Sequence, residues 1–210
     1  MRKLTLALLC VVQCLTLLLA PLPDVRSAQA ETSAGDGKTP AVVINEIHYD
    51  PRLHTAGVEY VELYNTGETG VDLTGWSLGK GIDFVFPLGT WLPAGGYALV
   101  ARNPAAVQQV YGAAAYGPFA GRLSNDGDDL LLRDRSGQTV DEVVYQLGFP
   151  WPTPNDNDDQ SIALVNALLD NSVPGVWRSD LPSPGRQNGF LIANPPPTVS
   201  EVSHAPQSPH

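Results

Sequence analysis

Short runs of apolar residues alternate with polar residues along most of this chain, and Gly, Asn, Asp and Pro separate one run from the next. Within the runs, apolar side chains recur at every second position, so that Ile82, Phe84 and Phe86 fall on one face of an extended strand. This period, with frequent turn residues, is typical of antiparallel β structure and predicts an all-β sandwich or barrel. The expected strands are AVVINEIHY from residue 41, VEYVELYN from 58, LTGWSL from 73, IDFVF from 82, YALVA from 97, DLLLRD from 129, VDEVVY from 140 and SIALV from 161.

One segment breaks the β pattern with the signals of a helix. Asn103 suits the N-cap, Pro104 suits the first helical position, and Gly112 can end the helix in the left-handed conformation. The pattern therefore predicts a short helix between Asn103 and Gly112. A second short helical segment is expected over residues 166–169.

An acidic stretch, LSNDGDDLLLRDRSGQTVDEVVY, runs from Leu123 to Tyr145. A calcium-binding EF-hand loop that started at Asp126 would need Gly at its sixth position, where Leu131 stands. Asn125 and Gly127 are instead turn residues, because both tolerate positive φ. The stretch is therefore predicted to form a β-hairpin whose acids lie mostly in turns and on the solvent-facing side.

A second acidic cluster, NDNDD, occupies residues 155–159 in a proline-rich loop. Asp156, Asp158 and Asp159 could converge on a calcium ion, which takes six or more oxygen ligands. The same residues also fit a solvated loop, and the sequence favours that interpretation because the EF-hand spacing fails at Ser161. Calcium stays a candidate ligand, and no other cofactor is expected.

Residues suited to catalysis are sparse. Glu46, His48, Asp50 and His54 lie close together in sequence and are a conceivable metal cluster, and the first three a conceivable hydrolytic site. The chain offers no further histidine with ligand spacing. Glu46, Glu62 and Asp141 are carboxylates on expected strands, and paired carboxylates act on glycosides only across a cleft. Nucleophile elbows, phosphate loops and dinucleotide fingerprints are lacking. We therefore assign no catalytic residue.

The first thirty residues have the parts of a secretory signal peptide. Arg2 and Lys3 form a basic start, residues 4–20 are apolar, and Ala28-Gln29-Ala30 is a small-residue cleavage site. We expect residues 1–30 to be removed on export, and residues 31–40, rich in Gly, Ser and Thr, to form a flexible linker. The protein is then secreted or held at the cell surface with no membrane span. Both cysteines leave with the apolar run, so no disulfide is expected.

Charge narrows the choice of partner. Cleavage leaves nine basic and 21 acidic residues, a formal charge of −12. Such a chain repels phosphate backbones, because nucleic-acid affinity rests largely on Lys and Arg. We therefore expect no nucleic acid as a partner, and instead a protein or a cell-surface polymer.

The chain becomes proline-rich over residues 191–210. Asn194-Pro195-Pro196-Pro197 predicts a stiff spacer, and TVSEVSH after it alternates like the first strand of another sandwich. A lone strand cannot bury its apolar face, so this end is either a disordered tail or a linker and the start of a further domain. We favour the second interpretation, which makes the sequence the N-terminal part of a larger protein.

The segments VINEIHYDP, EYVELYNTG, VDLTGWSLG, FVFPLGTWLPAGGYALVA, LSNDGDDLLLRD and VDEVVY occur in this order, followed by PWP and PSPGRQN. This series, over residues 41–188, resembles the lamin-tail domain family in its bacterial secreted form. The resemblance implies an immunoglobulin-like β-sandwich of about eight or nine strands with one short helix. The domain is accordingly expected over residues 41–190, and the chain end resembles the opening of a following immunoglobulin-like domain.

The resemblance also implies structural roles. Trp76 would be a core aromatic after a tight turn, and Gly95 and Gly96 would form the turn before the next strand, where positive φ is needed. The turn of the acidic hairpin matches the family as well. The positions with expected structural roles are Gly75, Trp76, Gly95, Gly96, Asn125 and Gly127.

In bacteria, the resemblance implies an accessory module of exported, multidomain proteins. We therefore expect a secreted, non-catalytic binding or structural module at the N-terminus of a larger extracellular or cell-surface protein. One alternative is a calcium-dependent surface or glycan-binding module. Another is a part of an exported hydrolase, which would use Glu46, His48 and Asp50, or of a spore-coat-type kinase-like protein.

Overall fold

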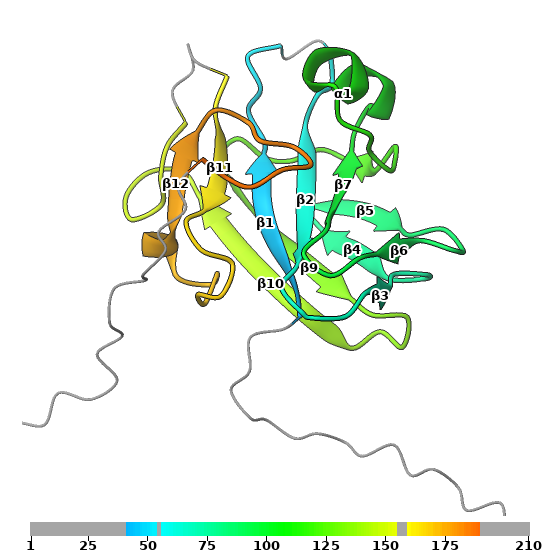
Figure 1. The fold of residues 1–210 in the computed structure, drawn as a ribbon. Helices are drawn as coiled ribbons and strands as arrows, with labels where there is room; N and C mark the ends of the chain where they lie inside the picture. Colours follow the sequence, from blue (N-terminus) through cyan, green and yellow to red (C-terminus); the bar gives the residue numbers. More distant parts are fainter. Residues whose placement is uncertain (1–40, 54–55, 155–158, 190–210) are drawn as a thin grey trace, which may run out of the picture. The chain divides into compact units, whose positions relative to one another are not determined.

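The computed structural model describes residues 41–53, 56–154 and 159–189, which form two five-stranded sheets, a two-stranded ribbon and one α-helix (Figure 1). The first sheet has the strand order β12-β11-β1-β2-β7 and the second the order β10-β9-β4-β5-β8, while β3 pairs with β6 in the ribbon. The strands are β1 (Val42–His48), β2 (Tyr60–Asn65), β3 (Val71–Asp72), β4 (Ser77–Lys80), β5 (Ile82–Val85), β6 (Trp91–Leu92), β7 (Tyr97–Ala101), β8 (Ala120–Gly121), β9 (Gly127–Arg133), β10 (Thr139–Gln146), β11 (Ser161–Leu164) and β12 (Trp177–Asp180).

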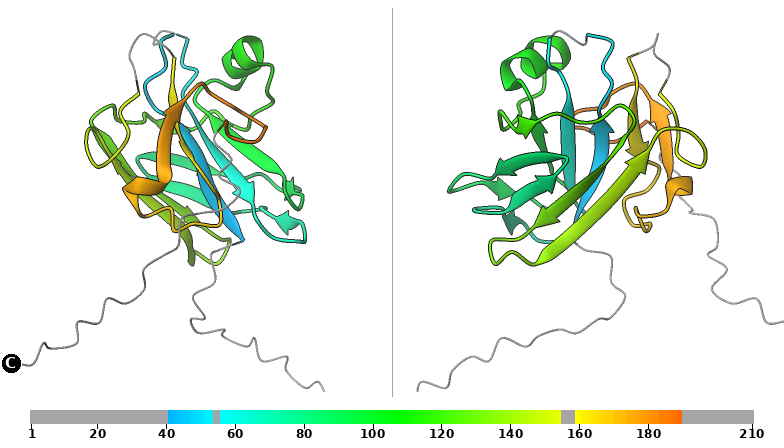
Figure 2. Two further views of the ribbon diagram at one scale, coloured as in Figure 1. Left: turned by 60° about the vertical axis from the view of Figure 1, so that its left-hand side comes forward. Right: turned by 180° about the vertical axis from the view of Figure 1, so that it is seen from behind.

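The apolar core lies between the two sheets. Ile44, Ile47 and Leu63 contribute to it from the first sheet, and Leu130 and Leu132 from the second. Seen from behind in Figure 2, β9 and β10 lie in front of β1 and β2, as in two stacked sheets. The predicted immunoglobulin-like β-sandwich is confirmed, and the described residues include nine strands of four or more residues and three of two residues.

The predicted helix and hairpin are both present. Helix α1 (Pro104–Tyr111) starts after Asn103, whose side chain accepts a hydrogen bond from the Ala106 N–H, and it ends at Gly112, where φ is 72°. β9 and β10 pair along the predicted hairpin. Among the described residues, no helix is long and apolar enough to cross a membrane.

The expectation of a second helical segment over residues 166–169 is wrong. The Asn166 side chain accepts a hydrogen bond from the Leu168 N–H at 2.9 Å, and this local bond holds the backbone in a turn. A short 3-10 helix, η1 (Pro174–Val176), lies further along the chain instead.

Trp76 fits its expected role only in part. It packs against the core but stays partly exposed. The fully buried tryptophan is Trp177, whose ring lies 5.9 Å from that of Trp151 and whose Nε1 donates to the Asn171 carbonyl oxygen at 2.8 Å. Trp177 begins β12, a strand that the period-two pattern does not reveal.

The expected turn glycines divide into two kinds. Gly75, Gly95 and Gly127 have φ of 73°, 65° and 117°, a region that favours glycine. Gly96 lacks a positive φ, but a Cβ on it would lie 2.6 Å from the Pro93 ring. Gly96 is therefore needed for close approach, not for backbone freedom.

The acids of the β9–β10 hairpin lie mostly in turns or towards solvent, as expected, with one exception. Asp129 and Glu142 do so, and both bind the Lys80 ammonium group. Asp141, however, is only 6% exposed. The pairing register shifts between Thr139 and Asp141, and this irregularity breaks the simple alternation of faces.

The first sheet is covered on both faces. Every residue of β1 is buried. On the face away from the core, Val107 of α1 packs in a small cluster with Tyr60 and Leu99. Figure 1 shows the orange segment after β12 crossing in front of β1 on this same face. The polar residues of β1 and β2 are therefore buried, although their neighbours are not the main core.

We predict that Trp177→Ala lowers the free energy of unfolding by ~3–5 kcal/mol, the usual range for emptying a buried aromatic site. Trp76→Ala is the matched comparison and should cost less, because Trp76 is partly exposed. Urea unfolding of both variants measures the difference. An equal or smaller loss for Trp177→Ala would contradict the assignment of Trp177 as the main core tryptophan.

Candidate functional site

Two glutamates stand side by side on neighbouring strands of the first sheet. Glu46 of β1 and Glu62 of β2 are register partners, and both are fully buried. The register shifts between Ile44 and Glu46, so that Ile44 joins the core while Asn45 and Glu46 both bond to groups on the outer face. Such bulges commonly re-aim side chains, and this one gathers a polar cluster on the outer face.

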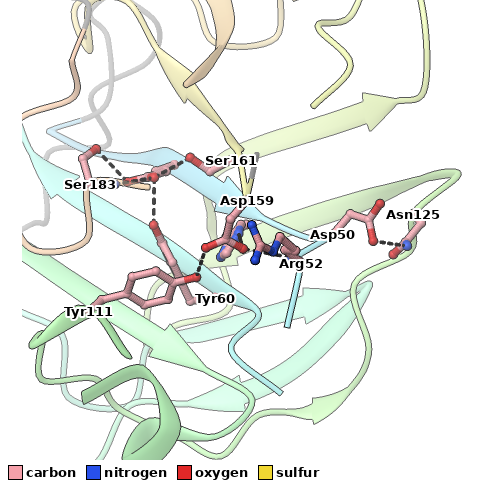
Figure 3. Close-up of polar contacts among 10 residues, drawn as sticks. Asp50, Arg52, Tyr60, Tyr111, Asn125, Asp159, Ser161 and Ser183 are labelled. Atoms are coloured by element: carbon pink, nitrogen blue, oxygen red, sulfur yellow. Dashed lines mark hydrogen bonds and ion pairs between the residues drawn. The ribbon is translucent and has the colours of Figure 1, made fainter. Parts of the chain in front are cut away.

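The segment of residues 182–188, which we name the capping segment, lies over Glu46. The Glu46 carboxylate accepts hydrogen bonds from the Tyr60 hydroxyl (2.8 Å), the Ser161 hydroxyl (2.5 Å), and both the N–H (2.9 Å) and hydroxyl (3.0 Å) of Ser183 (Figure 3). All four partners donate. Glu46 is thus the acceptor that joins β1 to β2, β11 and the capping segment.

Glu62 holds the same segment two residues further on. Its carboxyl group accepts hydrogen bonds from the Asn45 amide at 2.9 Å and from the Gly185 N–H at 2.6 Å. The backbone at Gly185 has a φ of 75°, a conformation that favours glycine. Glycine at this position therefore lets the backbone N–H point at Glu62. Asn188 then fixes the end of the segment, because its amide donates to the Leu164 carbonyl at 2.9 Å.

Burial perturbs Glu62 strongly. Desolvation, followed by the nearby Glu46, raises the pKa of Glu62 to about 8, although the hydrogen bonds from Gly185 and Asn45 act to lower it. A pKa of this size means that most Glu62 carboxyl groups are protonated in the folded protein at neutral pH. Perturbed carboxyl groups are typical of active sites but also of structural networks.

A third buried carboxylate closes the gap at the β1 bulge. Asp141 accepts hydrogen bonds from the Ile44 N–H at 2.6 Å and from the Asn171 amide at 2.8 Å. Burial raises the pKa of Asp141, and these two hydrogen bonds oppose the rise. Asp141 therefore supplies the acceptor that a regular strand partner would have given to Ile44.

His48 and Asp159 form a separate contact on the outer face. Asp159 accepts hydrogen bonds from the Arg52 N–H (2.8 Å) and the Tyr111 hydroxyl (2.9 Å), and Figure 3 shows it beside both. His48 Nε2 lies 3.6 Å from Asp159, a distance for an ion pair rather than a hydrogen bond. The neighbouring His48 is the main cause that lowers the pKa of Asp159 to about 2.

Of the three metal candidates expected from the sequence, only Asp159 lies within the described residues. Asp159 links the loop after β1 to α1, while Asp156 and Asp158 lie outside the described residues. His54 lies outside them as well. Asp50 accepts a hydrogen bond from Asn125 at 2.5 Å. In the described part of the chain, no three His, Cys, Asp or Glu side chains come together as a metal site.

Glu46, His48 and Asp50, the candidate residues of a hydrolytic site, each contact other protein groups instead of one another. Glu46 and His48 lie on one strand and bond on the same face, but Glu46 is filled by four donors and His48 faces Asp159. Asp50 pairs with Asn125, as Figure 3 shows. Neither Glu46 nor His48 reaches solvent, so neither can contact a substrate in this conformation.

Two surface cavities are present near these groups. One, of about 630 Å³, adjoins the start of α1 and includes Arg102, whose guanidinium group is bound to Glu59 at 2.9 Å. The other, of about 350 Å³, lies between Tyr64 and Tyr97 on one side and the turn after β11 on the other. Its lining also includes Asn188 of the capping segment.

No local pattern in the sequence indicates a role for Ser183, Gly185 or Asn188. The hydrogen bond from Ser183 to Glu46 joins residues 137 apart in sequence, which no local pattern can reveal. The Pro-Gly pair within PSPGRQN signals only a turn. The carboxylates that these residues cap were recognised only as acids on expected strands.

Comparison with known proteins identifies the family. The model of the lamin tail domain matches residues 36–146, which is more than half of the 210-residue chain and establishes the family. No match was found among curated proteins. The matched region ends with β10, so β11, β12 and the capping segment lie beyond it.

We predict that the folded protein becomes less stable as the pH rises towards 8. In the unfolded chain, Glu62 has the ordinary pKa of 4.5, whereas in the folded protein its pKa is about 8. Between these values the folded state holds a proton that the unfolded state has lost, so raising the pH favours unfolding. The free energy of unfolding should fall by up to ~1.4 kcal/mol per pH unit in this window.

Urea unfolding at several pH values measures this slope. Glu62→Gln should flatten it, because the amide does not titrate. Glu68→Gln is the matched control, since Glu68 is exposed, and it should keep the slope of the original protein. A slope that persists unchanged in Glu62→Gln would contradict the role of Glu62.

Proposed function

Because the chain belongs to the lamin tail domain family, we propose that it is a secreted, non-catalytic immunoglobulin-like module that binds at the cell surface. The partner is a protein or a surface polymer. In this proposal the module is of the bacterial secreted type and is an accessory part of a larger extracellular protein. Any catalytic domain of that protein, hydrolytic or kinase-like, would lie outside this sequence.

The use of the buried carboxylates carries the proposal. A general acid or base must come within hydrogen-bond reach of its substrate. Glu46, Glu62 and Asp141 instead accept hydrogen bonds from the protein itself, and each is at most 6% exposed. Their contacts join strands and hold the capping segment, which supports a structural role for these groups.

Export is supported by the sequence. Residues 1–30 have the composition of a cleaved signal peptide, and the residues after them contain no cysteine. The formal charge of −12 after cleavage argues against binding to phosphate backbones. It leaves proteins and uncharged or cationic surface polymers as partners.

Calcium dependence is the alternative within the same class. It rests on the NDNDD cluster, of which only Asp159 is described. Asp159 already serves Arg52 and Tyr111 as acceptor. Because Asp159 already accepts these hydrogen bonds, we expect the module to bind its partner without calcium. The melting temperature should then be the same in calcium and in chelator, since a ligand that binds the native state raises its stability.

The proposal predicts that the purified chain from residue 31 onward sediments with envelopes of the producing cells and lacks turnover of chromogenic phosphoesters and glycosides.

Glu46→Ala should unfold or strongly destabilise the protein, because the Tyr60, Ser161 and Ser183 donors lose their acceptor. Its exposed control, Glu68→Ala, should leave stability unchanged.

Two results would contradict the proposal. One is substrate turnover that Glu46→Gln abolishes while the protein stays folded by circular dichroism. The other is a chain that stays entirely in the supernatant when mixed with the envelopes.

A further inference from the structure

The smaller cavity is a groove on the outer face of the first sheet. Its volume is about 350 Å³, within the range of small-ligand sites. Tyr64 of β2 and Tyr97 of β7 form one wall, and residues 164–168 after β11 form the other. Asn188 of the capping segment contributes to the lining, and the exposed Gln187 stands beside it.

The groove is uncharged in an otherwise charged protein. The chain has 12 basic and 22 acidic residues, yet none of these types lines the groove among the described residues. Burial raises the pKa of Tyr97 to about 12, further above physiological pH than its ordinary value of 10.0, so this hydroxyl group carries no charge there. An ionic ligand would find no counter-charge in the lining, so the groove favours a neutral ligand.

The two tyrosines present both apolar and polar surface. They are register partners on neighbouring strands, with ring centroids 4.8 Å apart and planes inclined by 31°. Each ring offers an apolar face and a hydroxyl that can donate or accept. Together with the Gln187 amide, they suit a ligand that combines C–H faces with many hydroxyl groups.

Two polar residues of the lining, Asn45 and Asn188, are held in place before any ligand arrives. The amide groups of Asn45 and Asn188 exchange two hydrogen bonds of 3.1 Å. Asn45 is further bound to Glu62 at 2.9 Å, and Asn188 to the Leu164 carbonyl at 2.9 Å. A site fixed in this way loses little conformational freedom on binding.

The neighbouring strand edge disfavours a peptide ligand. Extended peptides commonly bind by adding a strand to a free edge. β7 is at the edge of the first sheet, but Tyr116 already occupies part of it, accepting from the Ala101 N–H and donating to the Leu99 carbonyl. This shortens the edge that a peptide could extend, whereas the side chains of the groove are open to a ligand.

We propose that this groove binds a neutral carbohydrate segment, stacked on Tyr64 and Tyr97 and hydrogen-bonded by Gln187. The proposal rests on the surface-binding function above and specifies the ligand as an uncharged glycan of the cell envelope.

The test is affinity electrophoresis of the purified chain through gels that contain dextran, galactomannan, xyloglucan or glucomannan. At least one of these neutral polysaccharides should retard the protein. Tyr97→Ala and Gln187→Ala should each weaken the retardation, by about tenfold in Kd for the aromatic change. Gln187 is exposed and Gln187→Ala should not disturb folding.

Matched controls lie away from the groove. Trp91→Ala removes a 60% exposed aromatic ring, and Gln146→Ala removes an exposed amide on the second sheet. Both should bind like the original protein. Retardation in none of the four gels, or retardation that survives both groove substitutions, would overturn the proposal.

Envelope sedimentation separates this proposal from the broader one. Periodate, which cleaves vicinal diols, should abolish binding to envelopes, and protease treatment of the envelopes should not. Binding that protease abolishes and periodate spares would overturn the glycan groove and leave the surface-binding function standing. Absence of any envelope binding would remove both.

Discussion

Two carboxyl groups that cannot reach water must find hydrogen-bond donors within the protein, and this requirement organises the outer face of the first sheet. Glu46 and Glu62 are register partners in the middle of the sheet. A buried polar group that lacks a hydrogen-bond partner is destabilising, whether or not it is charged. The donors come from Ser183 and Gly185 of the capping segment, so the position of the chain after β12 follows from the needs of β1 and β2.

This dependence extends the folding unit beyond the part of the chain that matches the family model. The match ends at residue 146, yet β1 pairs with β11 on one side, and Trp177 of β12 lies in the core. Asp141 and Asn171 complete the bulge of β1 from opposite sides of that boundary. The sandwich is therefore complete only with the residues up to 188.

The sequence predicted the parts of this fold that depend on local physics. The helix over residues 104–111 could be predicted because Asn103 and Gly112 are strong capping residues. The β9–β10 hairpin could be predicted because its turn residues and the alternation of its strands indicate the same structure. Trp177 was missed because β12 has no alternating run. The roles of Glu46 and Glu62 were hidden because a bulge breaks the alternation at Asn45 and because their partners in the capping segment lie more than a hundred residues away.

The same network connects structure with the proposed function. It removes from solvent the acids that could have acted in catalysis, and it fixes Asn45 and Asn188 in the lining of an uncharged groove. The most direct measurement of the central claim is amide hydrogen exchange at Ser183 and Gly185. If these N–H groups are bound to the buried carboxyl groups, they will exchange as slowly as amides in β1 and β2. Exchange at the rate of an exposed loop would contradict the account.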